Sequence, residues 1–196
     1  MSSTSRLQAL LTAIDDCNRQ DPNLEAVTGQ PLPKAFLYGQ RMSACLTDFA
    51  PKASEALQIA ARAQHIERWK IARASYPKNR VGYLQWRRDL GRFHAQRTCE
   101  LMKPLGYEQD VQDRVTKLLT KRGIKQDPEV QTLEDVICLV FVQFYLLDFA
   151  ATQETDKLLD IIAKTWAKMS PRGRQCLLTL KIDPVLESTL KKALAV

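Results

Sequence analysis

The sequence predicts an all-α fold, arranged as a single compact multi-helix domain over residues 1–196. Hydrophobic residues recur at helical spacing along most of the chain, and proline and glycine stand where helices are expected to end. Only residues 136–142 are rich in β-branched residues, and no second convincing strand is present to pair with them. With 45% hydrophobic and 26% charged residues, the chain has the profile of a globular protein with one core and no sheet.

The first 122 residues contain five segments with helical periodicity. We expect helices over residues 5–20, 34–49, 51–70, 81–103 and 108–122. Pro22 ends the first helix, and the glycine and prolines of residues 29–33 predict a loop. Pro51 suits the first position of a helix, where its missing amide hydrogen is not needed, and Pro104 ends the fourth helix. Residues 71–80 break the periodicity and are predicted to form an ordered loop.

The segment 136–142 is compatible with either a buried strand or a helix. Thr132 and Asp135 have the spacing of a capping box, which favours a helix over residues 132–151, the most buried of the fold. Further helices are expected over 154–168, 171–180 and 184–195. Ser170 is the predicted cap of the second of these helices, with Pro171 at its first position.

Positive charge is concentrated in the middle of the chain. Residues 62–125 contain sixteen Lys and Arg but six Asp and Glu, within a net charge of +7 for the whole chain. This imbalance favours an anionic small molecule or nucleotide as partner, with RNA as an alternative. The competing interpretation is a solvated helix face that binds nothing.

Cysteine content and hydropathy indicate the compartment. The five cysteines are an odd number and form no CxxC pair, which fits reduced thiols and a cytoplasmic location. The longest apolar stretch, residues 136–147, is too short to cross a bilayer, so no membrane partner is expected.

His65 and His94 are the only histidines, and both fall in the basic segment. We expect them on separate helices, with Glu134 and Asp135 at the start of the buried helix. Imidazole and carboxylate groups together suit a divalent metal ion, so His65, His94 and Asp135 are the predicted ligands and Glu134 the predicted catalytic acid or base. The alternative is that both histidines have structural roles and that Asp135 only caps its helix.

This order of histidine, histidine and aspartate on successive helices resembles the HD-type metal phosphohydrolases. The resemblance implies a divalent metal that activates a water molecule. The hallmark His-Asp doublet is incomplete here, since Ala95 follows His94.

Basic side chains alternate with aromatic ones between residues 62 and 93. Arginine grips phosphate through two parallel hydrogen bonds, and the predicted phosphate-binding residues are Arg68, Arg73, Arg80 and Lys121. Tyr83 and Trp86 could stack on a base or pack in the core. No glycine-rich phosphate loop, GxSxG or HExxH motif is present.

Several motifs together resemble the family known as domain of unknown function 4202. They are Gln64-His65-Ile66-Glu67-Arg68-Trp69, Arg73-x-x-Tyr76-Pro77-x-x-Arg80-x-Gly82-Tyr83, Phe93-His94-Ala95, Leu133-Glu134-Asp135 and Thr165-Trp166-x-Lys168-Met169-Ser170. The resemblance extends from Ile14 to about Leu180 and implies a compact helical domain without a known activity. Ala72 departs from the proline expected there.

Three functions therefore remain open. The first is a metal-dependent phosphohydrolase of HD-like type acting on a nucleotide or small phosphorylated substrate. The second is a non-catalytic RNA- or nucleotide-binding module, and the third is a protein-interaction domain. Bound metal would favour the first, and salt-dependent binding to RNA the second.

Overall fold

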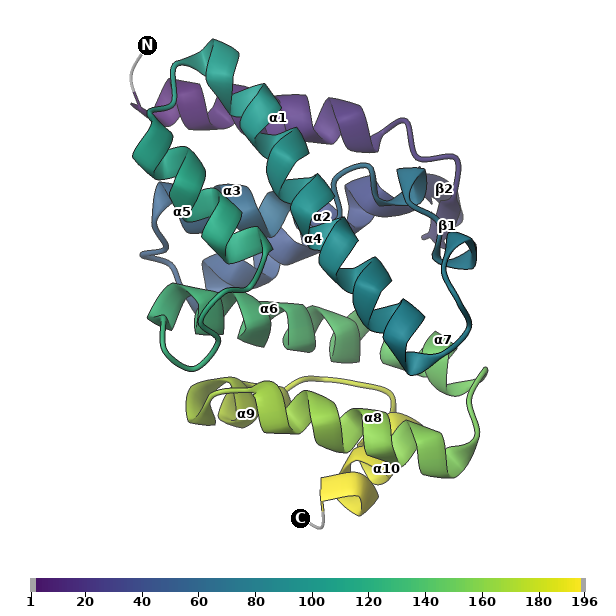
Figure 1. The fold of residues 1–196 in the computed structure, drawn as a ribbon. Coiled ribbons are helices and arrows are strands. Elements are labelled where there is room, and N and C mark those ends of the chain that lie inside the picture. The colour runs from purple at the N-terminus through teal and green to yellow at the C-terminus, as the bar shows by residue number, and fades with distance from the viewer. Residues whose placement is uncertain (1–2, 195–196) are drawn as a thin grey trace. The chain divides into compact units, whose positions relative to one another are not determined.

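The computed structural model describes residues 3–194, and most of them are helical (Figure 1). The prediction of an all-α fold class is confirmed. The chain divides into two compact units, residues 1–122 and residues 123–196. Each unit is described by itself below, and the single domain over 1–196 stays a prediction.

The first unit is a group of helices around α1 and α3. Its elements are α1 (Ser3–Asn18), β1 (Leu24–Val27), β2 (Gln30–Pro33), α2 (Lys34–Phe49), α3 (Glu55–Arg62), the 3-10 turns η1 (Arg68–Lys70) and η2 (Arg73–Ser75), α4 (Arg80–Met102), η3 (Lys103–Leu105) and α5 (Gln109–Leu119). Helix α1 packs against α2, α3 and α4, and α5 packs against α3 and α4. Leu10, Met42 and Ile59 are fully buried in this core.

A short antiparallel hairpin replaces the loop that the sequence predicts at residues 29–33. Leu24 pairs with Pro33 and Val27 with Gln30. The two residues between the strands, Thr28 and Gly29, have φ values of 48° and 81°, as required in the tight turns that match the twist of a hairpin. The prediction of no sheet was wrong because the strands are only four residues long and largely exposed, so they carry no hydrophobic alternation.

The helix predicted over residues 51–70 is much shorter in the structure. It begins at Glu55, because the Ser54 side chain accepts a hydrogen bond from the backbone N–H of Leu57, and it ends at Arg62. The prediction that Pro51 starts it was wrong. His65 consequently lies in the turn that follows α3 and not within a helix.

The second unit is built around α6. Its elements are α6 (Pro128–Phe144), α7 (Leu146–Ala150), α8 (Thr155–Lys168), α9 (Pro171–Leu178) and α10 (Pro184–Leu194). Helix α6 packs against α8 and α9, and α10 packs against α8. Leu133, Val136 and Val140 of α6 are fully buried. Ser170 is the cap of α9 and Pro171 its first residue, as predicted.

Helix α6 is correctly predicted as a helix over residues 136–142, but its start was placed too late. The Asp127 side chain accepts hydrogen bonds from the N–H groups of Glu129 and Val130, and Pro128 occupies the first helical position. Thr132 donates to the carbonyl of Pro128 instead of capping. The predicted capping box was therefore wrong, and Asp135 lies inside the helix.

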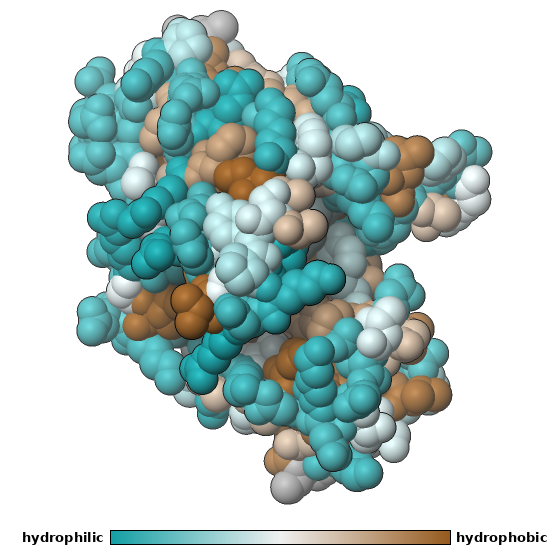
Figure 2. Space-filling model, turned by 45° about the vertical axis from the view of Figure 1, so that its right-hand side comes forward, coloured by the Kyte–Doolittle hydropathy of each residue, from teal (hydrophilic) through white to brown (hydrophobic). Residues whose placement is uncertain are grey.

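Exposed hydrophobic residues occur in small, separate groups on the face drawn in Figure 2, where hydrophilic residues predominate. Across the described part of the chain, none of the helices combines the length and the apolar character that crossing a membrane requires.

Candidate functional site

The turn between α3 and η1 contains an unusual backbone conformation. Glu67 has φ 47° and ψ 33°, the left-handed region that non-glycine residues rarely adopt. Its backbone N–H donates a 3.0 Å hydrogen bond to Oδ1 of Asn18, which is fully buried at the end of α1. Such a conformation costs on the order of 1–3 kcal/mol and persists only where the surrounding contacts impose it.

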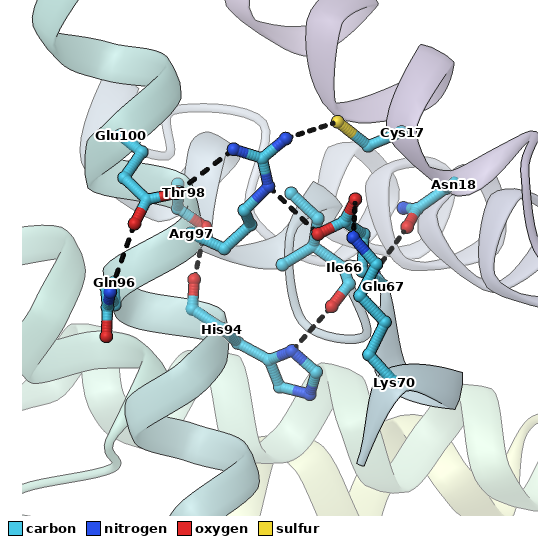
Figure 3. A network of polar contacts seen from close by, with 10 residues as sticks. All are labelled: Cys17, Asn18, Ile66, Glu67, Lys70, His94, Gln96, Arg97, Thr98 and Glu100. Carbon is cyan, nitrogen blue, oxygen red and sulfur yellow. Dashed lines mark hydrogen bonds and ion pairs between the residues drawn. The ribbon is translucent and has the colours of Figure 1, made fainter.

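The buried carboxylate of Glu67 supplies those contacts (Figure 3). It accepts hydrogen bonds from Nζ of Lys70 at 2.8 Å and from Nε of Arg97 at 2.9 Å. Arg97 lies on α4 and also donates to Glu100 and to Sγ of Cys17 on α1. The network therefore ties α1, the turn and α4 together, and fixes the direction of the groups that flank Glu67.

His94 of α4 is anchored by the residue before Glu67. Its side chain is only 2% exposed, and Nδ1 lies 2.8 Å from the backbone oxygen of Ile66. A carbonyl oxygen only accepts, so Nδ1 carries the proton and Nε2 keeps its lone pair. Burial, and next the charge of Arg68, lowers the pKa of His94 to about 3, so the ring is neutral at physiological pH.

Nε2 of His94 is buried and has no hydrogen-bond partner among the residues that the structure describes. In Figure 3 this nitrogen points away from Ile66 and from the Glu67 network. Native proteins rarely leave a buried acceptor unpaired, because the desolvated group costs about 1–3 kcal/mol.

His65 stacks on a tyrosine and lies near His94. Its ring centroid is 3.7 Å from that of Tyr38, with the planes 17° apart, and 6.3 Å from that of His94. Burial holds the pKa of His65 well below its usual value of 6.5, and Arg68, His94, Arg87 and Lys121 lower this pKa further. Every charged group that shifts this pKa is cationic.

The side chain of Arg68 packs over an aromatic ring and does not form an ion pair with a carboxylate in the described chain. Its Cζ is 4.7 Å from the ring centroid of Trp86, whose Nε1 donates to the backbone oxygen of Ile71 at 3.0 Å. Burial, and next the charge of Arg87, lowers the pKa of Arg68. Arg87 itself donates a long 3.4 Å hydrogen bond to the hydroxyl of Tyr83. Neither arginine has a carboxylate partner among the described residues.

We name Arg68, Arg87 and Lys121, the three cations whose charge acts on His65, the cationic cluster. Two of the four predicted phosphate ligands, Arg68 and Lys121, belong to it. Arg73 instead donates to the backbone oxygens of Tyr76 and Pro77, which closes the loop before α4. Arg80 is exposed as the first residue of α4.

The residues predicted to bind metal fall in both units. His65 and His94 are neighbours in the first unit, whereas Asp135 and Glu134 lie on α6 of the second. Asp135 is 2% exposed, and its oxygens accept hydrogen bonds from the backbone N–H and hydroxyl of Ser170 and from the amide of Gln131. It thereby holds the cap residue of α9.

Glu134 is also buried, with Nζ of Lys168 4.0 Å from its carboxylate. Among residues 3–194, no group of three or more His, Cys, Asp or Glu side chains is arranged to hold a metal ion. The metal site and the catalytic role of Glu134 stay predictions.

A cavity of about 400 Å³ lies within the second unit, beside the starts of α6 and α9. Both helix starts are already capped, by the side chains of Asp127 and Ser170. Arg174, which lines the cavity, donates through Nε to the backbone oxygen of Trp166. The polar groups named here already have partners, so the cationic cluster is the better candidate for ligand binding.

Sequence reasoning missed the residues that position the site, namely Asn18, Glu67 and Arg97. The only signal was Glu67 itself, the single acid between residues 62 and 88 in a run of basic residues. An isolated acid of this kind is compatible with a buried ion pair. Its left-handed backbone conformation could not be predicted, because in a sequence only glycine indicates that conformation.

The comparisons with known proteins identify a family but no activity. The family model described as a domain of unknown function (DUF4202) matches residues 8–190. No curated protein and no solved structure matches the chain.

Proposed function

Because the chain belongs to the DUF4202 family, whose description names no activity, we propose a function from the site alone: binding of a small phosphorylated molecule by the cationic cluster. The observation that supports it is the position of Arg68. Arg68 is half-buried, lies close enough to Arg87 for the pKa of its guanidinium to fall, and has no carboxylate partner in the described chain.

Like charges held close together destabilise one another, and an anion between them reverses the sign of that interaction. A phosphate group suits the arrangement because guanidinium donors match its oxygens in pairs. Trp86 adds a rigid aromatic surface that holds the Arg68 side chain in place.

The same charges disfavour a divalent metal at the histidines. A cation there would face the positive groups that already depress the pKa of His65, while Asp135 is engaged with Ser170. The described residues thus fit an anion better than a metal ion, and the metal-dependent phosphohydrolase is the second candidate. One observation favours it: a histidine with Nδ1 bound to a carbonyl and Nε2 unpaired has the orientation typical of metal ligands.

Isothermal titration of the full chain with inorganic phosphate and adenosine monophosphate tests the proposal. We expect Arg68→Gln to weaken binding of both by about tenfold or more, because a charge-assisted contact is worth about 1.5–3 kcal/mol. Arg80→Gln is the matched control, since Arg80 is exposed, and should change affinity by less than about twofold.

An absence of binding to the unmodified chain, or an equal loss in both variants, would contradict the proposal. Elemental analysis of protein purified without added metal addresses the second candidate. One equivalent of a transition metal would favour the phosphohydrolase over the binding module.

A further inference from the structure

The unpaired nitrogen of His94 restricts which phosphorylated molecule fits the cationic cluster. Nε2 is an acceptor that no donor reaches within the described part of the chain, and His94 is only 2% exposed. A 180° turn of the ring would place Cδ2 where Nδ1 now lies and would lose the 2.8 Å bond to Ile66. The Glu67 network holds that carbonyl in turn, so the acceptor is fixed in direction.

A fully ionised phosphate group cannot satisfy this nitrogen. An ionised phosphate ester presents oxygen acceptors, and two lone pairs facing each other repel. Arg68 and Arg87 carry donors and act electrostatically on His94, yet neither makes a hydrogen bond to it. A hydroxyl group supplies the missing donor and keeps a lone pair for a neighbouring cation.

We propose that the ligand of the cationic cluster is a hydroxylated phosphate ester, of the sugar phosphate or polyol phosphate class, whose hydroxyl donates to Nε2 of His94 while its phosphate binds Arg68. This inference rests on the proposed function, because it assigns the phosphate to the same cluster. It adds a hydroxyl contact to Nε2 of His94 as the determinant of specificity.

The experiment compares ligands of equal charge with and without hydroxyl groups. Glycerol 3-phosphate and n-propyl phosphate have the same number of carbon atoms, and ribose 5-phosphate adds a ring. We expect both hydroxylated esters to bind the full chain at least about tenfold more tightly than propyl phosphate, because a site built around a hydroxyl discriminates against the ligand that lacks it.

His94→Asn is the informative variant. The asparagine amide N–H can take the place of Nδ1–H and donate to Ile66, while the acceptor Nε2 disappears. We expect this variant to bind all three esters with the affinity that the unmodified chain shows for propyl phosphate. Circular dichroism of the variant verifies that its helices are formed, and the comparison of esters on the unmodified chain does not depend on it.

The outcomes separate this inference from the proposed function. Equal affinity for the three esters on the unmodified chain would overturn the hydroxyl contact and leave phosphate binding intact. If His94→Asn still binds the hydroxylated esters more tightly than propyl phosphate, the inference is also overturned, because another group would then bind the hydroxyl. No binding of any ester or of inorganic phosphate would overturn both.

Discussion

Asp135 illustrates, at the scale of one residue, how a buried carboxylate can stabilise a helix other than its own. Both of its oxygens accept hydrogen bonds from Ser170, at 2.8 Å from the backbone N–H and 2.5 Å from the hydroxyl. Gly173 of α9 passes so close that a Cβ atom there would lie 2.6 Å from the Asp135 carboxylate. The aspartate and the glycine therefore form one tight contact between α6 and α9.

Replacing this carboxylate should destabilise the protein. We expect Asp135→Asn to lower the free energy of unfolding by about 1.5–3 kcal/mol, because the amide nitrogen faces donors and the charge-assisted bonds are lost. Urea unfolding followed by circular dichroism measures the loss. Asp148→Asn, at an exposed position of the same unit, should stay within about 0.5 kcal/mol and serves as control. Equal effects of the two substitutions would show that Asp135 is not structural.

The sequence singled out Asp135 as a candidate functional residue, but it did not predict that this carboxylate holds Ser170. From the sequence, the spacing to Thr132 suggested a cap of its own helix. The real partner, Ser170, lies 35 residues further along the chain, and no local pattern contains that information. The sequence analysis expected His65 and His94 to lie close together only as ligands of a metal ion. The hydrogen bond from His94 to Ile66 became apparent only in the structure.

At the scale of elements, proline and capping residues determined how well the boundaries were predicted. The starts of α9 and α4 follow local signals, with Ser170 capping the first and Asn79 the second. The start of α3 was misplaced because Pro51 and Ser54 both suit a helix start, and the hydrogen bond from Leu57 shows that Ser54 is the cap. The β hairpin was missed because its strands are short and polar.

The buried character of α6 was predicted from its apolar run and can be tested. Leu139 is 1% exposed, so Leu139→Ala should lower the free energy of unfolding by about 2–5 kcal/mol through lost burial and the cavity left behind. Leu147 of the next helix is 46% exposed, and Leu147→Ala should cost less than about 1 kcal/mol. Denaturant unfolding of both variants gives the comparison. A loss below 1 kcal/mol for Leu139→Ala would contradict the position of the core.

At the scale of the whole molecule, the two histidines make stability sensitive to acid. The folded pKa of His94 is about 3, below its usual 6.5, so between these values the unfolded chain binds more protons than the folded one. Stability is therefore fully present above about pH 6.5 and is lost as the pH falls toward 3, by up to about 1.4 kcal/mol per pH unit. The lowered pKa of His65 acts in the same direction.

Urea unfolding at pH 7 and at pH 5 measures this effect while most ordinary carboxylates stay ionised. We expect the unfolding midpoint to fall between the two conditions, and to fall less in His94→Asn, which has no imidazole at this position. Unchanged midpoints for the unmodified chain would show that folding does not lower the pKa of His94.

The left-handed backbone at Glu67 also has a consequence for the order of events during synthesis. The contacts that impose it come from Asn18, 49 residues earlier, and from Arg97, 30 residues later. Translation proceeds at about 5–20 residues per second, and non-local contacts form only after the intervening loops close. A nascent chain that has not yet exposed α4 outside the ribosome lacks Arg97, so its Glu67 turn has only part of the contacts that hold it in the left-handed region. The orientation of Ile66 and the anchoring of His94 are thus acquired late, and together.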